Sequence, residues 1–169
     1  MTKDYGKTWK HISKNIPKSY SSFVHVVRED HQMPGILYAG TDNALYLSVD
    51  DGNNWSKINN NLPPAPVYWI SLQEHFDDMV VGTYGRGIYI LDDISPFREL
   101  ASSNKEKIVL MPIQDAYRFQ NIQSMKNDGT SLIRGQNPAY GANIDFFLPD
   151  TTSKNIIISI HDMNNNEIR

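Results

Sequence analysis

The feature that most constrains this chain is an octapeptide that occurs twice. Residues 2–9 and 48–55 both read Ser/Thr-x-Asp-x-Gly-x-x-Trp, and a lysine and an isoleucine follow each copy within three residues. The two tryptophans set a period of 46 residues (55 − 9). A fixed period in this range predicts an architecture of repeated supersecondary units. The shared positions are Thr2, Asp4, Gly6 and Trp9 in the first copy and Ser48, Asp50, Gly52 and Trp55 in the second.

The residue types of the octapeptide predict a tight turn. An aspartate side chain can accept hydrogen bonds from backbone amides a few residues further on, and glycine adopts positive φ without a steric cost. We expect the tryptophan to fold back as an apolar plug over the hairpin. These properties describe a structural turn rather than a catalytic device.

A second register supports the same organisation. Leu37-Tyr38-Ala39-Gly40-Thr41 matches Val80-Val81-Gly82-Thr83 at a spacing of 42 residues (82 − 40). Continuing this register predicts a third, degenerate octapeptide in which Asp92 takes the place of Asp50 and Phe97 takes the place of Trp55. Terminal repeats are commonly atypical because they face a different neighbour.

Composition and spacing favour an all-β fold. The chain has 169 residues, of which 11% are aromatic, and short apolar runs alternate with turn-forming residues. Such runs are typical of strands. The strands predicted in the first hundred residues are 23–28, 36–41, 44–49, one that begins at Trp55, 67–72, 79–83 and 87–91.

The octapeptides resemble the Asp-box, or BNR, repeat of β-propellers related to sialidases and sortilin-like receptors. That resemblance implies four-stranded blades with the box between the third and fourth strands, so the expected fold is a partial β-propeller followed by a partial β-sandwich. It also implies an extracellular, periplasmic or cell-surface location, although this chain carries no signal peptide. Because three partial blades cannot close a ring, we expect a fragment whose open edges are covered by the remaining blades or by another chain.

The boxes stop after Leu100, which suggests a domain boundary. Residues 1–100 are interpreted as C-terminal blades, residues 101–136 as a connecting segment, and residues 137–169 as the start of an immunoglobulin-like or fibronectin-like domain. Strands are predicted from Ala142 to Leu148 and from Asn155 to His161.

Four residues are candidates for ligand binding. Tyr84 and Arg86 lie in the loop expected at the blade face opposite the Asp boxes, and Tyr68 and Trp69 follow the loop between blades, which reaches the same face. Aromatic rings and an arginine at such a rim could stack on a sugar or bind a carboxylate. The alternative is that Arg86 pairs with Asp92 or Asp93 and the aromatic side chains fill the packing between blades.

The charge pattern and residue content exclude several classes of partner. A net charge of −3 with scattered lysines and arginines leaves no basic patch for nucleic acid. No apolar run is long enough to span a membrane. There is no cysteine, and the five histidines lack the spacing of a metal site, so neither a metal nor a cofactor is expected.

Three functions remain open. The first is a non-catalytic binding or scaffold module that recognises a glycan or a peptide. The second is a piece of a sialidase-like glycoside hydrolase whose catalytic residues lie mostly upstream, because the adjacent acidic pairs here do not form the separated carboxylates that such enzymes need. The third is a purely structural or assembly module.

Overall fold

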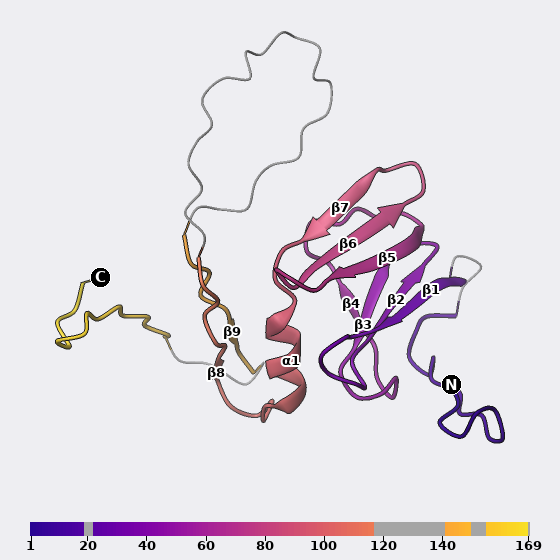
Figure 1. The fold of residues 1–169 in the computed structure, drawn as a ribbon, viewed down its shortest axis with the longest axis horizontal. Coiled ribbons are helices and arrows are strands. Elements are labelled where there is room, and N and C mark those ends of the chain that lie inside the picture. Colours follow the sequence, from indigo (N-terminus) through magenta and orange to yellow (C-terminus); the bar gives the residue numbers. More distant parts are fainter. Residues whose placement is uncertain (19–21, 117–140, 150–154, 169) are drawn as a thin grey trace, which may run out of the picture.

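The computed structural model describes residues 1–18, 22–116, 141–149 and 155–168. The fold is mostly β, as the sequence predicts, with two antiparallel sheets side by side, a short helix after the second sheet and a small strand pair beyond it (Figure 1). The elements are β1 (Val24–Glu29), β2 (Leu37–Thr41), β3 (Leu45–Ser48), β4 (Ser56–Ile58), β5 (Val67–Gln73), β6 (Asp78–Thr83), β7 (Ile88–Leu91), α1 (Ser95–Ser102), β8 (Val109–Leu110) and β9 (Phe146–Phe147).

The first sheet is a four-stranded meander in the order β1-β2-β3-β4. Every residue of β2 and β3 is buried. Both strands are therefore covered on both faces, which explains why their sequences are almost continuously apolar instead of alternating. The octapeptide that begins at Ser48 joins β3 to β4, the third and fourth strands of this sheet.

The second sheet repeats the first three strands in the order β5-β6-β7. In the first sheet Val26 and Leu45 flank Gly40, and in the second Trp69 and Ile88 flank Gly82. Each sheet thus places a glycine at the same point of its middle strand. The predicted strand limits in both sheets agree with the observed ones within a residue or two.

A shared core joins the two sheets. Gly40 lies close against the second sheet, because a Cβ atom built there would lie 2.6 Å from Val67 Cγ1 and 2.6 Å from the Val67 carbonyl oxygen. A side chain at position 40 would therefore push the sheets apart. The buried apolar residues of this core are Val26, Ile36, Tyr38, Leu45, Leu47, Val67, Ile70, Met79, Val81 and Ile94.

The opposite face of the first sheet is covered by the N-terminal segment. Trp55, which is 6% exposed, and Ile16 pack there with residues of β2 and β3. A Cβ atom at Gly52 would lie 2.8 Å from Ile12 Cβ, and Gly52 has a φ of +76°. Glycine is thus required at position 52 both by the turn and by the segment packed on it.

The helix α1 is a departure from the sequence prediction. We expected a third, degenerate box with Asp92 and Phe97, but Phe97 lies in α1, where it packs against the core between the sheets. Pro96 stands in the first turn of the helix, where its missing N–H costs nothing. Phe97 does pack as an apolar side chain, as expected, but it belongs to a helix and not to a turn followed by a fourth strand.

The described part of the C-terminal region contains little regular structure. Strand β8 pairs with β9, and His161 forms an isolated bridge with Glu167. The strand predicted from Asn155 to His161 is otherwise absent, because residues 155–160 have no strand partner among the described residues. Most of the predicted connecting segment, from residue 117 onward, and the start of the predicted second domain, residues 137–140, lie outside the described residues.

Candidate functional site

The aromatic candidates gather at one end of the two sheets. Tyr68 and Trp69 lie in β5, and Tyr84 follows β6 directly. His25 in β1 joins them, and we call these four side chains the aromatic cluster. The Tyr84 amide donates to the Pro66 carbonyl oxygen at 2.9 Å, which fixes the end of β6 beside the loop that enters β5.

The rings of the cluster are stacked in series. His25 and Tyr68 lie parallel, with ring centroids 4.1 Å apart, and Tyr68 and Tyr84 are tilted with centroids 5.9 Å apart. The His25 ring also pairs with the Asp42 carboxylate through Nε2. These contacts hold the Tyr68 ring between two others and limit its rotation.

Irregularities in the strands position the first two rings. A shift of register occurs in the first sheet between Val24 and Val26 and in the second between Val67 and Trp69. His25 and Tyr68 are therefore the extra residues of equivalent β-bulges. Because a bulge re-aims its side chain, the rings of neighbouring sheets can meet.

Trp69 is held separately by Arg28. The Arg28 guanidinium carbon lies 4.7 Å from the centre of the Trp69 ring, and Nε donates to the Ile70 carbonyl oxygen at 3.1 Å. The exposed fractions are 51% for Tyr68, 59% for Trp69 and 74% for Tyr84. Tyr68 and Trp69 thus each contact a side chain of the first sheet, as the alternative expects, while more than half of each residue stays exposed.

Arg86 lies at the tip of the turn between β6 and β7. The turn is built by Gly85 and Gly87, whose φ angles are +76° and +84°, and by Thr83, whose hydroxyl donates to the Gly87 carbonyl oxygen at 2.6 Å. Arg86 is exposed. Within the described part of the chain it forms no ion pair with Asp92 or Asp93.

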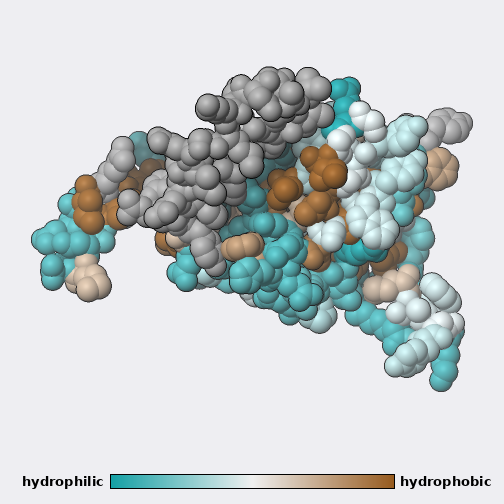
Figure 2. Space-filling model, turned by 45° about the horizontal axis from the view of Figure 1, so that its top comes forward, coloured by the Kyte–Doolittle hydropathy of each residue, from teal (hydrophilic) through white to brown (hydrophobic). Residues whose placement is uncertain are grey.

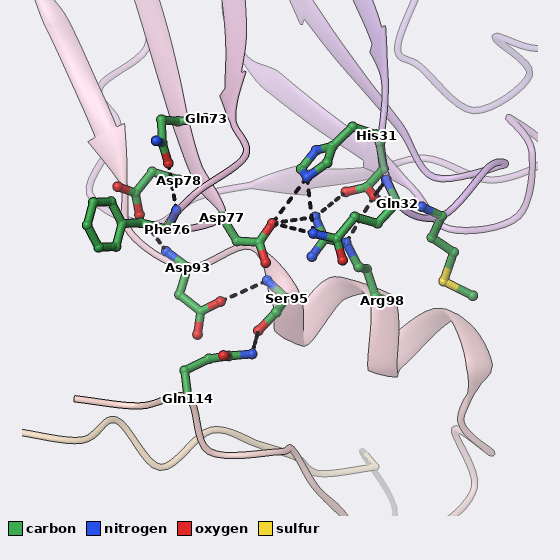
Figure 3. Close-up of polar contacts among 12 residues, drawn as sticks. His31, Gln32, Gln73, Phe76, Asp77, Asp78, Asp93, Ser95, Arg98 and Gln114 are labelled. Atoms are coloured by element: carbon green, nitrogen blue, oxygen red, sulfur yellow. Dashed lines mark hydrogen bonds and ion pairs between the residues drawn. The ribbon is translucent and has the colours of Figure 1, made fainter. Parts of the chain in front are cut away.

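The opposite end of the sheets carries an ionic cluster around the buried Asp30 (Figure 3). Arg98 of α1 donates from Nε to Asp30 Oδ1 at 2.9 Å, and from Nη2 to Asp30 Oδ2 at 3.1 Å and to Asp77 Oδ1 at 2.9 Å. His31 Nε2 lies 3.4 Å from the same Asp77 oxygen. One guanidinium therefore ties the helix to the loops that follow β1 and β5, which makes this cluster a structural clamp.

The clamp perturbs the acidities of its members. Burial opposes the charge on Asp30, but the hydrogen bonds from Arg98 and from two backbone amides hold its pKa below the ordinary value. Burial, together with the Asp30 charge and hydrogen bond, raises the pKa of Tyr38, whose hydroxyl donates to Asp30 at 3.3 Å. Asp30 is therefore a fixed anion that orders its surroundings.

The two octapeptide turns make the same hydrogen bonds. The Gly6 and Gly52 amides donate to the hydroxyls of the first box residues at 2.8 and 2.9 Å. Asp4 and Asp50 each accept at Oδ1 from the amide four residues on, at 2.8 Å in both turns. Hydrogen bonds from Thr8 lower the pKa of Asp4 to about 2.

The tryptophans of the two turns differ in their surroundings. Trp9 is 74% exposed, and its indole donates to the Gly6 carbonyl oxygen within its own turn at 3.1 Å. Trp55 is buried, and its indole donates to the carbonyl oxygen of Ile12 in the N-terminal segment. The expectation of a packed plug thus applies to Trp55 and is wrong for Trp9.

A third carboxylate turn lies where no box was predicted. Asp162 accepts at Oδ1 from the amide of Asn166 at 2.8 Å and at Oδ2 from the Asn166 side chain at 3.0 Å. Asp50 receives the same pair of bonds from Asn54. The Asp-x-x-x-Asn spacing was the available signal, and the missing serine, glycine and tryptophan concealed it.

Other kinds of site find little support in the described ranges. No group of three or more histidine or acidic side chains there could hold a metal ion, and no helix there has the length and apolarity to cross a bilayer. Asp92 and Asp78 are close enough that burial and the charge of Asp78 raise the pKa of Asp92.

Comparison of the chain with protein-family models, curated proteins and solved structures finds no match.

Proposed function

We propose that this chain is a non-catalytic binding module that recognises a glycan through the aromatic cluster and Arg86. We further propose that its two sheets are consecutive blades of an Asp-box propeller in an exported protein. The observation that carries the binding proposal is the series of partly exposed rings His25, Tyr68 and Tyr84 at one end of the sheets.

Local and tertiary geometry both support the proposal of blades. The two box turns share their hydrogen bonds, and the box of the first sheet joins its third strand to its fourth. The sheets share a core and have equivalent glycines and equivalent bulges. Such equivalence is typical of repeated units stacked on one another.

The chemistry of the cluster supports a sugar ligand. A pyranose presents an apolar face of C–H groups to an aromatic ring and hydroxyls at its edge, and exposed tyrosines offer both a ring and a polar tip. Tyr68 is held by its neighbours, so little side-chain entropy would be lost on binding. Arg86 could bind a sugar carboxylate with two parallel hydrogen bonds, which favours an acidic glycan.

The proposal is tested by binding to oligosaccharides. Neutral and acidic oligosaccharides, including sialyllactose and oligogalacturonate, are titrated into the protein in a calorimeter. Tyr84→Ala should weaken the binding observed by about tenfold, the loss expected from roughly 1.4 kcal/mol of stacking. Arg86→Ala should weaken binding of the acidic sugars only.

A matched control separates binding from stability. Tyr5 is a fully exposed tyrosine in the first box turn, distant in sequence from the cluster, so Tyr5→Ala should change neither binding nor melting temperature. Binding of peptides with no binding of any oligosaccharide would contradict the proposal. A large drop in the melting temperature of Arg86→Ala would also contradict the proposal, because an arginine that binds a ligand at a turn tip should not contribute to stability.

A further inference from the structure

The outer edge of β7 lacks the strand that its counterpart has. In the first sheet β3 pairs with β4 through Leu45 and Ile58, Tyr46 and Lys57, and Leu47 and Ser56. The residues equivalent to β3 are Ile88 to Ile90 of β7, and β7 is the last strand of its sheet in the described structure. Figure 1 shows β7 at the margin of the second sheet, with α1 leaving below it.

A hollow of about 530 Å³ lies along this open edge. It is bordered by residues 89–93, which include the end of β7, by Ile58 of the first sheet, by Phe97 of α1, and by Asn143 and Asp145 of the segment that leads into β9. The hollow thus occupies the region beside β7 that a fourth strand would fill. Apolar side chains are exposed next to it, since Ile88 is 74% and Ile90 is 61% exposed. Figure 2 shows brown apolar surface over this part of the molecule.

The same chain contains an apolar segment without a strand partner. Residues 155–160 read Asn-Ile-Ile-Ile-Ser-Ile, and among the described residues they belong to no sheet. Ile157 is 88% exposed and Ile158 is 51% exposed. The segment is rich in β-branched residues, which favour strands. In Figure 1 it lies at the far end of the molecule from β7.

We propose that two copies of this chain exchange strands, with residues 156–159 of each copy pairing along β7 of the other and completing its second sheet. Backbone pairing supplies affinity in this mode of recognition, and alternate side chains enter adjacent pockets. A segment that is apolar on both sides suits the position. One face would continue the exposed row of Ile88 and Ile90, and the other would enter the hollow.

The strand exchange would also cover two exposed apolar surfaces at once. An open edge strand with apolar neighbours is a site for unwanted association, and an isolated run of isoleucines is another. Reciprocal pairing covers both and produces a closed assembly with two-fold symmetry.

The first test is the mass in solution. Sedimentation of the full chain over a range of concentrations should show twice the mass of one chain at the upper end. Ile158→Pro removes a backbone donor and should return the protein to a monomer, and Ile158→Val should leave the dimer in place. Because Ile158 is exposed and belongs to no sheet among the described residues, neither change should lower the melting temperature of the monomer.

The second test uses the absence of cysteine from the chain. Chains carrying Ile90→Cys are mixed with differently tagged chains carrying Ile157→Cys or Ile158→Cys and are then oxidised. One of the two adjacent tail positions should give much more mixed disulfide than the other, because neighbouring residues of a strand point to opposite faces. Met163→Cys, at a fully exposed turn beyond the segment, serves as the control and should give little.

Any of three results would overturn the proposal. One is a monomer at every concentration. Another is equal cross-linking from Ile157→Cys, Ile158→Cys and Met163→Cys, which would indicate random encounter instead of a strand in register. A dimer that survives Ile158→Pro would also exclude pairing through this segment.

Discussion

At the scale of single residues, the octapeptide turn forms through local hydrogen bonds, whereas the role of its tryptophan depends on what packs around it. Asp4 and Asp50 bind the same backbone groups although one turn is exposed and the other is largely covered. The same carboxylate geometry recurs at Asp162 without serine, glycine or tryptophan. The aspartate spacing therefore determines the turn, and the tryptophan matters only where another segment buries it.

The two tryptophans make a matched pair of substitutions. Trp55→Ala should lower the free energy of unfolding by about 3 to 5 kcal/mol, because it empties a buried site and removes the hydrogen bond to Ile12. Trp9→Ala should cost less than about 1 kcal/mol, since its indole is mostly exposed. Urea denaturation followed by far-ultraviolet circular dichroism measures both values. Equal losses would show that the turns have the same tertiary role.

The buried carboxylate Asp30 predicts a dependence of stability on pH. Its pKa is lowered in the folded protein, so its charge stabilises the fold above the ordinary value of 3.8 and this contribution is lost as the pH falls through the lower folded pKa. The urea midpoint should therefore drop below pH 3.8, and Asp30→Asn should reduce that drop without removing it, because Asp4 and Asp50 titrate in the same direction. An unchanged slope in the variant would contradict the role of Asp30.

At the scale of elements, the two sheets are equivalent in register but differ in what covers them. The first sheet has β4 on its edge and is covered on both faces. The second has α1 after β7, and the face that carries Trp69, Val80, Ile88 and Ile90 is not covered by another sheet in the described structure. The same glycine position consequently experiences different contacts in the two sheets.

The equivalent glycines predict unequal tolerance of a methyl group. Gly40→Ala should destabilise the protein by about 1 to 3 kcal/mol, because the new Cβ would meet Val67 at 2.6 Å across the interface between the sheets. Gly82→Ala should cost less, since the nearest atom is Trp69 Cβ at 3.3 Å and this side chain is half-exposed. Thermal melting of the two variants measures the difference. A larger loss for Gly82→Ala would argue against the sheet packing described here.

At the scale of the whole molecule, Arg98 connects elements that are far apart in the sequence. It lies in α1, and its partners Asp30 and Asp77 follow the first strand of each sheet. The Asp30 side chain is completely buried, so its charge depends on this arginine. The helix and its arginine therefore form the clamp across the ends of both sheets and enclose their shared core.

Removal of the clamp should destabilise both sheets together. Arg98→Met retains much of the side-chain volume but leaves Asp30 as an unpaired buried charge, and it should cost about 3 to 5 kcal/mol. Hydrogen exchange should show faster opening of β2 and of β6 in the same cooperative step. Faster exchange confined to α1 would mean that the helix is an attachment and not part of the core. The double variant Arg98→Met with Asp30→Leu should recover part of the loss, because the buried charge is then absent.

The sequence by itself determined the repeat, the strands of both sheets and the position of the box turn, because these depend on local hydrogen bonds, backbone conformation and an apolar pattern within a few residues. The tertiary structure decided which tryptophan is buried, that a helix replaces the third box, and that His25 and Tyr68 stack through equivalent bulges. It also decided the pairing of Arg98 with Asp30, which are 68 residues apart. These outcomes depend on contacts between segments that are distant in the chain. No local sequence pattern specifies which distant segment will pack against a given residue.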